Sequence, residues 1–323
     1  MKAAILYALG KAPKFGEYPE PEIKNDNQLI LNVKAAAVKN IDKGIASGKH
    51  YSSSEKLTEP QLIGMEAVGM LDDGTRVYAV GRQGMIAEKA LIDKDKFVRI
   101  PDQLNDLTAA ALPNAVWGSA PAILFRANLQ PGETVLINGA TGVTGIVAVQ
   151  IAKYYGASKV IVTGRNSEML NKLIEFGADE VISLKQDDEQ ILKDIRAIHS
   201  TSPIDIVIDY LWGHPAELVL TALQGKGELT HQVRFVTVGS MAGEKIQLSS
   251  GILRSSNIQI SGSGIGSLPK AVMGKLFSEI LPEMFQLAVD GKLKIETVSA
   301  PLQDVETVWN MDVPSGKRLV ITI

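Results

Sequence analysis

Short apolar runs separated by turn-forming residues dominate the first hundred residues of the chain. In one of them, Leu29, Leu31 and Val33 alternate with positions that include Asn32 and Lys34, a period typical of a partly exposed strand. Many short strands with few helical signals predict an all-β module. The runs are Ala3–Tyr7, Leu29–Val38, Ala67–Leu71, Arg76–Val80 and Met85–Ile92.

From residue 134 onward, strand patterns alternate with helical patterns, which predicts a parallel sheet covered on both faces. One helix is signalled at both ends: Ser167 can cap its start, and Gly177 supplies the left-handed residue that ends it. The segments are Thr134–Asn138, Val143–Tyr155, Lys159–Thr163, Ser167–Phe176, Glu180–Ser183, Glu189–His199, Ile204–Asp209, Ala216–Leu223 and Val233–Val238.

The last part of the chain returns to strand character. Ile258–Ser261 predicts one more strand, and Pro269–Asp290 a long helix that Pro282 should kink or break. Strands follow in Thr297–Ile323. We therefore expect an α/β protein in which residues 118–264 form a nucleotide-binding domain, inserted between the two parts of a β-rich catalytic domain, residues 1–117 and 265–323.

Composition narrows the class of protein. The 323 residues carry 33 Lys and Arg against 36 Asp and Glu, a balance without the basic excess that nucleic acid or an anionic membrane would require. The absence of cysteine excludes disulfides, Cys-ligated metals and a thiol nucleophile. The uncharged stretches contain glycine or proline and predict buried globular segments rather than membrane spans. We expect a cytoplasmic protein.

A glycine-rich turn carries the clearest chemical signal. Gly139, Gly142 and Gly145 follow a buried strand and open an apolar helix. Such a turn lets the backbone approach a pyrophosphate, and the helix N-terminus presents N–H groups to the anion. We therefore predict a dinucleotide site at the turn, made by Gly139, Ala140, Thr141, Gly142, Val143, Thr144 and Gly145.

The residues after the next strand indicate which dinucleotide binds. That strand ends in Gly164, Arg165 and Asn166, with no carboxylate before Glu168. A carboxylate here would bind the ribose 2′-hydroxyl of NADH, whereas a guanidinium pairs with the 2′-phosphate of NADPH. We predict NADPH.

These motifs, taken together, resemble the zinc-free quinone oxidoreductase branch of the medium-chain dehydrogenase/reductase superfamily. The resemblance runs over essentially the whole chain. It implies a GroES-like β-rich domain and a Rossmann domain. Besides the glycine turn, it rests on Met1–Ala4, Val38–Gly48, Leu62–Gly69, Arg76–Tyr78, Ala109–Asn114, Pro131–Leu136, Gly177–Glu180, Val236–Ser240 and Gly316–Ile321.

The resemblance also implies which residues form the site. Zinc-dependent members place a Cys near Lys39 and a His in the motif that here reads Gly64-Met65-Glu66, so we expect no catalytic metal and a structural acceptor role for Glu66. The family implies cofactor contacts at Val238, Gly239 and Ser263. It places substrate-pocket candidates Lys39, Asn40 and Tyr51 in a loop after the second strand, and leaves open whether His50 or Lys317 reaches the site.

The activity implied is hydride transfer from NADPH to a small electrophile, a quinone or an α,β-unsaturated carbonyl, by a homodimer. Such acceptors need no Lewis acid when hydrogen-bond donors stabilise the developing oxyanion. Two alternatives remain open: an enoyl-thioester reductase, and a non-catalytic NADPH-binding sensor.

Overall fold

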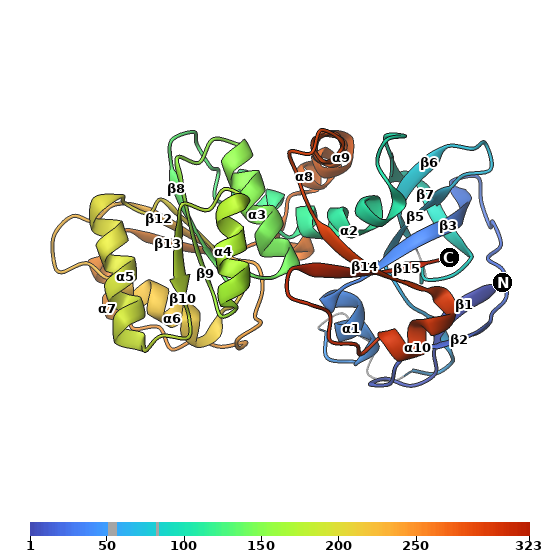
Figure 1. Cartoon of the computed structure of the whole chain (residues 1–323), viewed down its shortest axis with the longest axis horizontal. Helices are drawn as coiled ribbons and strands as arrows, with labels where there is room; N and C mark the ends of the chain where they lie inside the picture. The colour runs from blue at the N-terminus through green and yellow to red at the C-terminus, as the bar shows by residue number, and fades with distance from the viewer. Residues whose placement is uncertain (51–56, 82–83) are drawn as a thin grey trace. The chain divides into compact units, whose positions relative to one another are not determined.

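The structure is a computed structural model that describes residues 1–50, 57–81 and 84–323 (Figure 1). Contacts along the chain divide it into two compact units, one formed by Met1–Asn114 and Gly274–Ile323 and the other by Ala115–Met273. No helix within the described ranges is long and apolar enough to cross a membrane.

The first unit is built from a six-stranded sheet of order β14-β15-β3-β5-β6-β7 and a three-stranded sheet of order β2-β1-β4. An additional pairing between β3 and β7 closes β3, β5, β6 and β7 into a ring. The strands are β1 Lys2–Leu6, β2 Lys14–Glu17, β3 Gln28–Val38, β4 Gln61–Leu62, β5 Glu66–Met70, β6 Arg76–Gly81, β7 Lys89–Arg99, β14 Glu296–Pro301 and β15 Lys317–Thr322.

The predicted strand pattern of this unit is confirmed, because Leu31 and Val33 of β3 are buried while Lys34 is exposed. The helices are largely additions to that prediction. Pro282 follows a break in the predicted long helix, which divides into α8, a π-helical segment and α9. The helical elements are α1 Asn40–Ala46, α2 Asp106–Trp117, α8 Lys270–Lys275, η3 Leu276–Ile280, α9 Leu281–Val289, η4 Leu302–Asp304 and α10 Val305–Val308, of which α2 and α8 each contain a boundary between the two units.

The second unit is a six-stranded parallel sheet of order β10-β9-β8-β11-β12-β13. In Figure 1, α3 and α4 lie on one side of this sheet and α5, α6 and α7 on the other, as right-handed crossovers require. Its strands are β8 Thr134–Asn138, β9 Lys159–Gly164, β10 Glu180–Ser183, β11 Ile206–Asp209, β12 Val233–Thr237 and β13 Ile258–Gly262.

The predicted alternation of strands and helices is confirmed, with one correction to a cap. The side chain of Asn166, not Ser167, caps α4 by accepting a hydrogen bond from the Met169 N–H at 3.0 Å. Gly177 ends the helix with φ of 105°. The helical elements of this unit are η1 Pro121–Arg126, α3 Val143–Tyr154, α4 Ser167–Glu175, α5 Asp188–Thr201, α6 Gly213–Ala222, α7 Ser250–Ser255 and η2 Ile265–Ser267.

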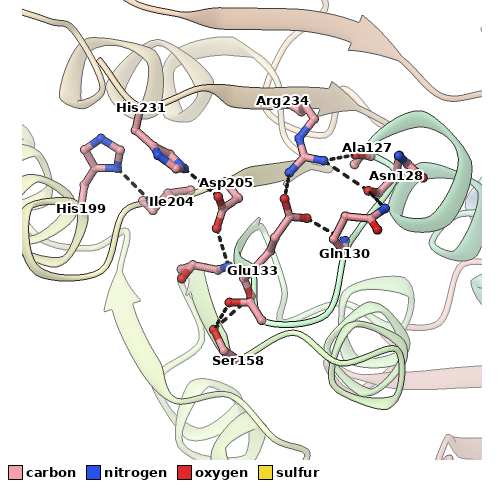
Figure 2. Close-up of polar contacts among 12 residues, drawn as sticks. Ala127, Asn128, Gln130, Glu133, Ser158, His199, Ile204, Asp205, His231 and Arg234 are labelled. Atoms are coloured by element: carbon pink, nitrogen blue, oxygen red, sulfur yellow. Dashed lines mark hydrogen bonds and ion pairs between the residues drawn. The ribbon is translucent and has the colours of Figure 1, made fainter. Parts of the chain in front are cut away.

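A polar cluster joins the edge at which β8, β11 and β12 begin (Figure 2). Asp205 accepts the Thr134 N–H at 2.7 Å and pairs with His231 at 2.6 Å. Arg234 pairs with Glu133 and donates to the Ala127 carbonyl. These contacts tie the strand starts together at the edge opposite the glycine turn.

His199 in the same cluster makes stability dependent on pH. Its Nδ1 accepts the Ile204 N–H at 3.0 Å, which requires an unprotonated Nδ1, and burial together with the nearby His231 lowers the pKa of His199. As the pH falls, His199 is protonated more readily in the unfolded chain than in the folded chain. Its contribution to the free energy of unfolding is therefore complete above about pH 6.5 and is lost as the pH falls below that value.

We expect His199→Gln to reduce the loss of stability on acidification. Urea unfolding at pH 7.5 and pH 5.5 gives the loss of unfolding free energy for the variant and for wild type. His231 and Asp205 are present in both proteins, so the difference between the two losses belongs to His199. An identical loss of unfolding free energy in the two proteins contradicts the assignment.

Candidate functional site

The glycine turn has the predicted strand–turn–helix geometry. β8 ends at Asn138, Gly139 takes a left-handed φ of 86°, and Gly142 is the N-cap of α3. The turn is anchored to the next strand by the Ala140 N–H, which donates to the Thr163 carbonyl at 2.9 Å. The chain therefore carries a tight turn directly before a helix N-terminus.

Two glycines of this turn are required by crowding, and the third is not. A Cβ at Gly139 would lie 2.6 Å from Cγ of Leu211, and one at Gly145 would lie 2.5 Å from Cα of Ala140. Gly142 has an ordinary φ of −87°, and apart from its neighbours along the chain no described heavy atom lies within 4 Å of where its Cβ would stand. Neither strain nor crowding explains Gly142, whereas a ligand that closely approaches the backbone does.

The start of α3 suits an anion. The first N–H groups of a helix have no acceptor within the helix, and Gly142 contributes no side chain to cap them. The N-terminal end of the helix dipole adds a partial positive charge. The residues present thus fit a phosphate-bearing cofactor such as a dinucleotide.

A surface cavity of about 610 Å³ lies beyond the end of β9. Gly164 allows the approach of the Thr141 side chain, whose Cγ2 would lie 2.4 Å from a Cβ at that position. The cavity is lined by Arg165, Asn166, Ser167, Glu168 and Lys185. It holds two cations against one carboxylate, beside the N-terminus of α4, so it favours an anionic group.

Lys185 is the residue of this cavity that the sequence analysis missed. It follows β10, which lies next to β9 in the sheet, and the Leu184 N–H donates to the Gly164 carbonyl at 2.7 Å. Because parallel strands end at the same edge, a cation after the strand that follows β9 is the signal that would have identified it.

The remaining predicted cofactor residues lie at this same edge of the sheet. Val238 follows β12 and donates its N–H to the Asp209 carbonyl at 2.7 Å, and Gly239 comes next. Ser263 follows β13 and donates its N–H to the Thr237 carbonyl at 2.8 Å. The structure therefore brings the ends of β8, β9, β12 and β13 together.

Lys39 lies elsewhere, at the centre of a buried charge cluster in the first unit. Its side chain is 1% exposed, and Nζ lies 3.1 Å from Ala37 O, 3.1 Å from Asp42 Oδ2 and 3.4 Å from Glu66 Oε1. Burial alone would lower the pKa of Lys39, but Asp42 and Glu66 together hold that pKa above its usual range. The ammonium is directed at protein oxygens.

A second buried cation completes the cluster. Arg318 of β15 donates to Asn114 at 3.4 Å, and its burial lowers its pKa while Glu66 and Asp42 oppose the change. Glu66 also accepts the Tyr78 hydroxyl at 2.7 Å, which confirms its role as a structural acceptor. Two cations and two carboxylates thus join strands from both ends of the chain.

The other candidates of the first unit have different surroundings. Asn40 was expected in a loop, but it is the first residue of α1 and is exposed. Asp42 caps the start of this helix by accepting the Lys39 N–H at 2.9 Å. Lys317 pairs with Glu296 of β14 at 3.5 Å. His50 donates its N–H to the Gly44 carbonyl, and Tyr51 lies outside the described residues.

Comparison with known proteins identifies the family. A family model described as "Zinc-binding dehydrogenase" matches residues 143–286. The quinone oxidoreductase of Sus scrofa is 30% identical over 248 residues, which cover 73% of this chain and 72% of that protein. The chain belongs to the quinone oxidoreductase branch of the medium-chain dehydrogenase/reductase superfamily.

Other relatives agree with this placement. A probable NADPH-dependent quinone reductase of Emericella nidulans is 26% identical, with 96% of each chain covered. A probable oxidoreductase from Mycobacterium abscessus has a TM-score of 0.82 at 24% identity, covering 100% of this chain and 99% of that chain. The quinone oxidoreductase from Thermus thermophilus, described also in complex with NADPH, has a TM-score of 0.77 at 24% identity, covering 100% of both chains. These structures confirm the α/β fold with a Rossmann-like parallel sheet and a separate β-rich domain.

The residues of this family member do not fit a catalytic zinc. The sequence has no cysteine, and the charges of Lys39 and Arg318 together already balance the two carboxylates, Asp42 and Glu66, that a cation there would need. Across the described ranges, no group of three His, Cys, Asp or Glu side chains is arranged to hold a metal ion.

We expect Lys39→Met to destabilise the protein by about 3–5 kcal/mol, because it leaves two buried carboxylates facing one guanidinium. The double variant Lys39→Met/Glu66→Gln restores the balance of charge and should be more stable than Lys39→Met alone. Urea titrations give both unfolding free energies. A single variant within about 1 kcal/mol of wild type, a typical surface effect, contradicts this account of the cluster.

Proposed function

We propose that this quinone oxidoreductase family member transfers a hydride from NADPH to a quinone or an α,β-unsaturated carbonyl. The observation that carries the choice of NADPH is the cavity after β9, which joins Arg165 and Lys185 to the start of α4. Its chemistry suits the 2′-phosphate, since charge-assisted hydrogen bonds to a phosphate are roughly twice as strong as neutral ones.

The proposed cofactor contacts divide by chemistry. The backbone of the turn 139–145 would hold the pyrophosphate at the start of α3. Arg165, Asn166 and Lys185 would hold the adenosine end, and Gly164 would keep that strand end free of a repelling carboxylate. Val238, Gly239 and Ser263 would contact the nicotinamide half.

When bound, NADPH would supply the hydride, so the chain has to position the acceptor and stabilise negative charge on its oxygen. We propose Asn40 and Tyr51 as donors to that oxygen. Lys39 would act indirectly. Its buried ammonium is directed at Ala37, Asp42 and Glu66, and its main-chain N–H donates to Asp42 at the start of α1, the helix that carries Asn40.

We also propose that the protein is a homodimer. β13 forms the outer edge of its sheet and pairs with β12 alone among the described strands. An edge strand with unpaired N–H and C=O groups is a natural pairing surface for a second copy.

An NADPH-oxidation screen tests the reaction. Purified protein is mixed with NADPH and, separately, with quinones, enones, enals and enoyl thioesters, and absorbance of the reduced nucleotide is followed. We expect turnover with quinones or enones. Turnover confined to enoyl thioesters, or saturable binding of NADPH without oxidation, would contradict the proposed substrate class.

We expect Arg165→Ala and Lys185→Ala each to weaken NADPH binding by about 10–100-fold, the loss of roughly 1.5–3 kcal/mol for a charged hydrogen bond. NADH binding should change little, because NADH lacks the 2′-phosphate. Titration of each variant with both nucleotides measures this selectivity.

Lys193→Ala is the matched control, because it removes one exposed positive charge of α5 that does not line the cavity. The control should bind both nucleotides as wild type does. Equal weakening of NADPH and NADH by Arg165→Ala would refute its assignment to the 2′-phosphate.

A further inference from the structure

Asp209 is a fully buried carboxylate at the end of β11 that accepts hydrogen bonds from one side chain and two main-chain N–H groups. Its Oδ1 accepts from Asn138 Nδ2 at 2.8 Å and from the Leu211 N–H at 3.2 Å. Its Oδ2 accepts the Trp212 N–H at 3.0 Å. Burial raises the pKa of Asp209, while these donated hydrogen bonds favour the charged form.

A relay of side chains extends from this carboxylate to the glycine turn. Since Asn138 donates to Asp209, its Oδ1 faces the other way and accepts the Thr163 hydroxyl at 2.6 Å. The Thr163 oxygen in turn accepts the Gly139 N–H at 3.1 Å. Each member has one orientation that satisfies its neighbours, so the ends of β11, β8 and β9 are fixed relative to one another.

The same carboxylate holds a strained turn. Trp212 has φ of 52° and ψ of −159°, a conformation that is close to exclusive to glycine and costs on the order of 1–3 kcal/mol in other residues. The two main-chain N–H groups bound by Asp209 belong to Trp212 itself and to Leu211, the residue before it. The carboxylate thus offsets the strain.

The strained turn contacts the chain that follows β8 on one side and the chain that follows β12 on the other. The Leu211 side chain fills the space beside Gly139, where a Cβ would be 2.6 Å away, and the Leu211 carbonyl accepts the Ala242 N–H beyond β12 at 2.8 Å. β8 and β11 are the neighbouring strands at which the order of the sheet reverses. In open α/β sheets, the crevice at such a reversal is where ligands bind.

We propose that Asp209 is a positioning residue for the dinucleotide, which holds the glycine turn and the strained turn Leu211–Gly213 at the spacing that the cofactor requires. This inference rests on the proposed binding of a nicotinamide dinucleotide. The proposed role of Asp209 concerns the portion of the dinucleotide that NADPH and NADH share. The proposed roles of Arg165 and Lys185 concern the 2′-phosphate, which only NADPH carries.

The test compares the affinities of Asp209→Asn for both nucleotides. The amide keeps the size of the carboxylate but turns an N–H₂ group toward donors, so we expect NADPH and NADH to bind about 10–100-fold more weakly, by the same factor. Thr163→Val, which removes only the hydroxyl of the relay, should weaken both in the same direction, and serves if Asp209→Asn does not fold.

The exchange variant Asp209→Asn/Asn138→Asp provides the rescue. A carboxylate at 138 accepts from Thr163 and from the amide at 209, whose oxygen is then left for the main-chain N–H groups. We expect this variant to recover most of the lost affinity. A mere loss of packing would not be reversed by moving the charge to the neighbouring strand.

Asp205→Asn is the structural control, because Asp205 precedes the same strand at the opposite edge and also accepts a main-chain N–H. It should lower the thermal unfolding midpoint without changing either nucleotide affinity. If wild type binds both nucleotides and folded Asp209→Asn binds them equally well, the inference is overturned alone. If wild type binds neither, the proposed function fails and takes this inference with it.

Discussion

The convergence of parallel strand ends on one edge of a sheet is the constraint on which the candidate cofactor site depends. β8, β9, β10 and β12 are separated in sequence by helices, yet their carboxyl ends meet at the edge that carries Gly142, Arg165, Lys185 and Gly239. Each of these residues can contribute to a cofactor site only because the others lie at the same edge. The opposite edge of the sheet carries a cluster of polar groups that pair with one another (Figure 2).

Two pairs of cations, Lys39 with Arg318 and Arg165 with Lys185, have opposite surroundings. Lys39 and Arg318 are buried and face carboxylates of their own domain, so their charges hold structure together. Arg165 and Lys185 are exposed beside a helix N-terminus. A cation that is to bind an anion has to stay unsatisfied by the protein, and exposure allows that at little cost in desolvation. Burial therefore distinguishes a structural lysine from a candidate binding lysine.

Local sequence predicted those features whose causes are local. The strand–turn–helix geometry around Gly142 and the left-handed end of α4 at Gly177 follow from glycine spacing and hydrophobic period. The helix α1 was missed because its N-cap, Lys39, is capped by a carboxylate at 42 within a cluster completed by Glu66, a contact between strands that are far apart in the sequence. Lys185 was missed for a related reason, since its neighbourhood depends on strand order.

Strain is the feature that sequence shows least, and Trp212 illustrates why. A tryptophan before a glycine gives no sign of a positive φ, and an isolated chain would avoid it. The conformation persists because Asp209, held by Asn138 on the neighbouring strand, supplies acceptors to two successive N–H groups. Strain of this kind requires rigid surroundings, and a rigid binding site holds a flexible dinucleotide in one conformation. The buried carboxylate of Asp209 and the strained turn at Trp212 therefore act together, because the first stabilises the conformation of the second.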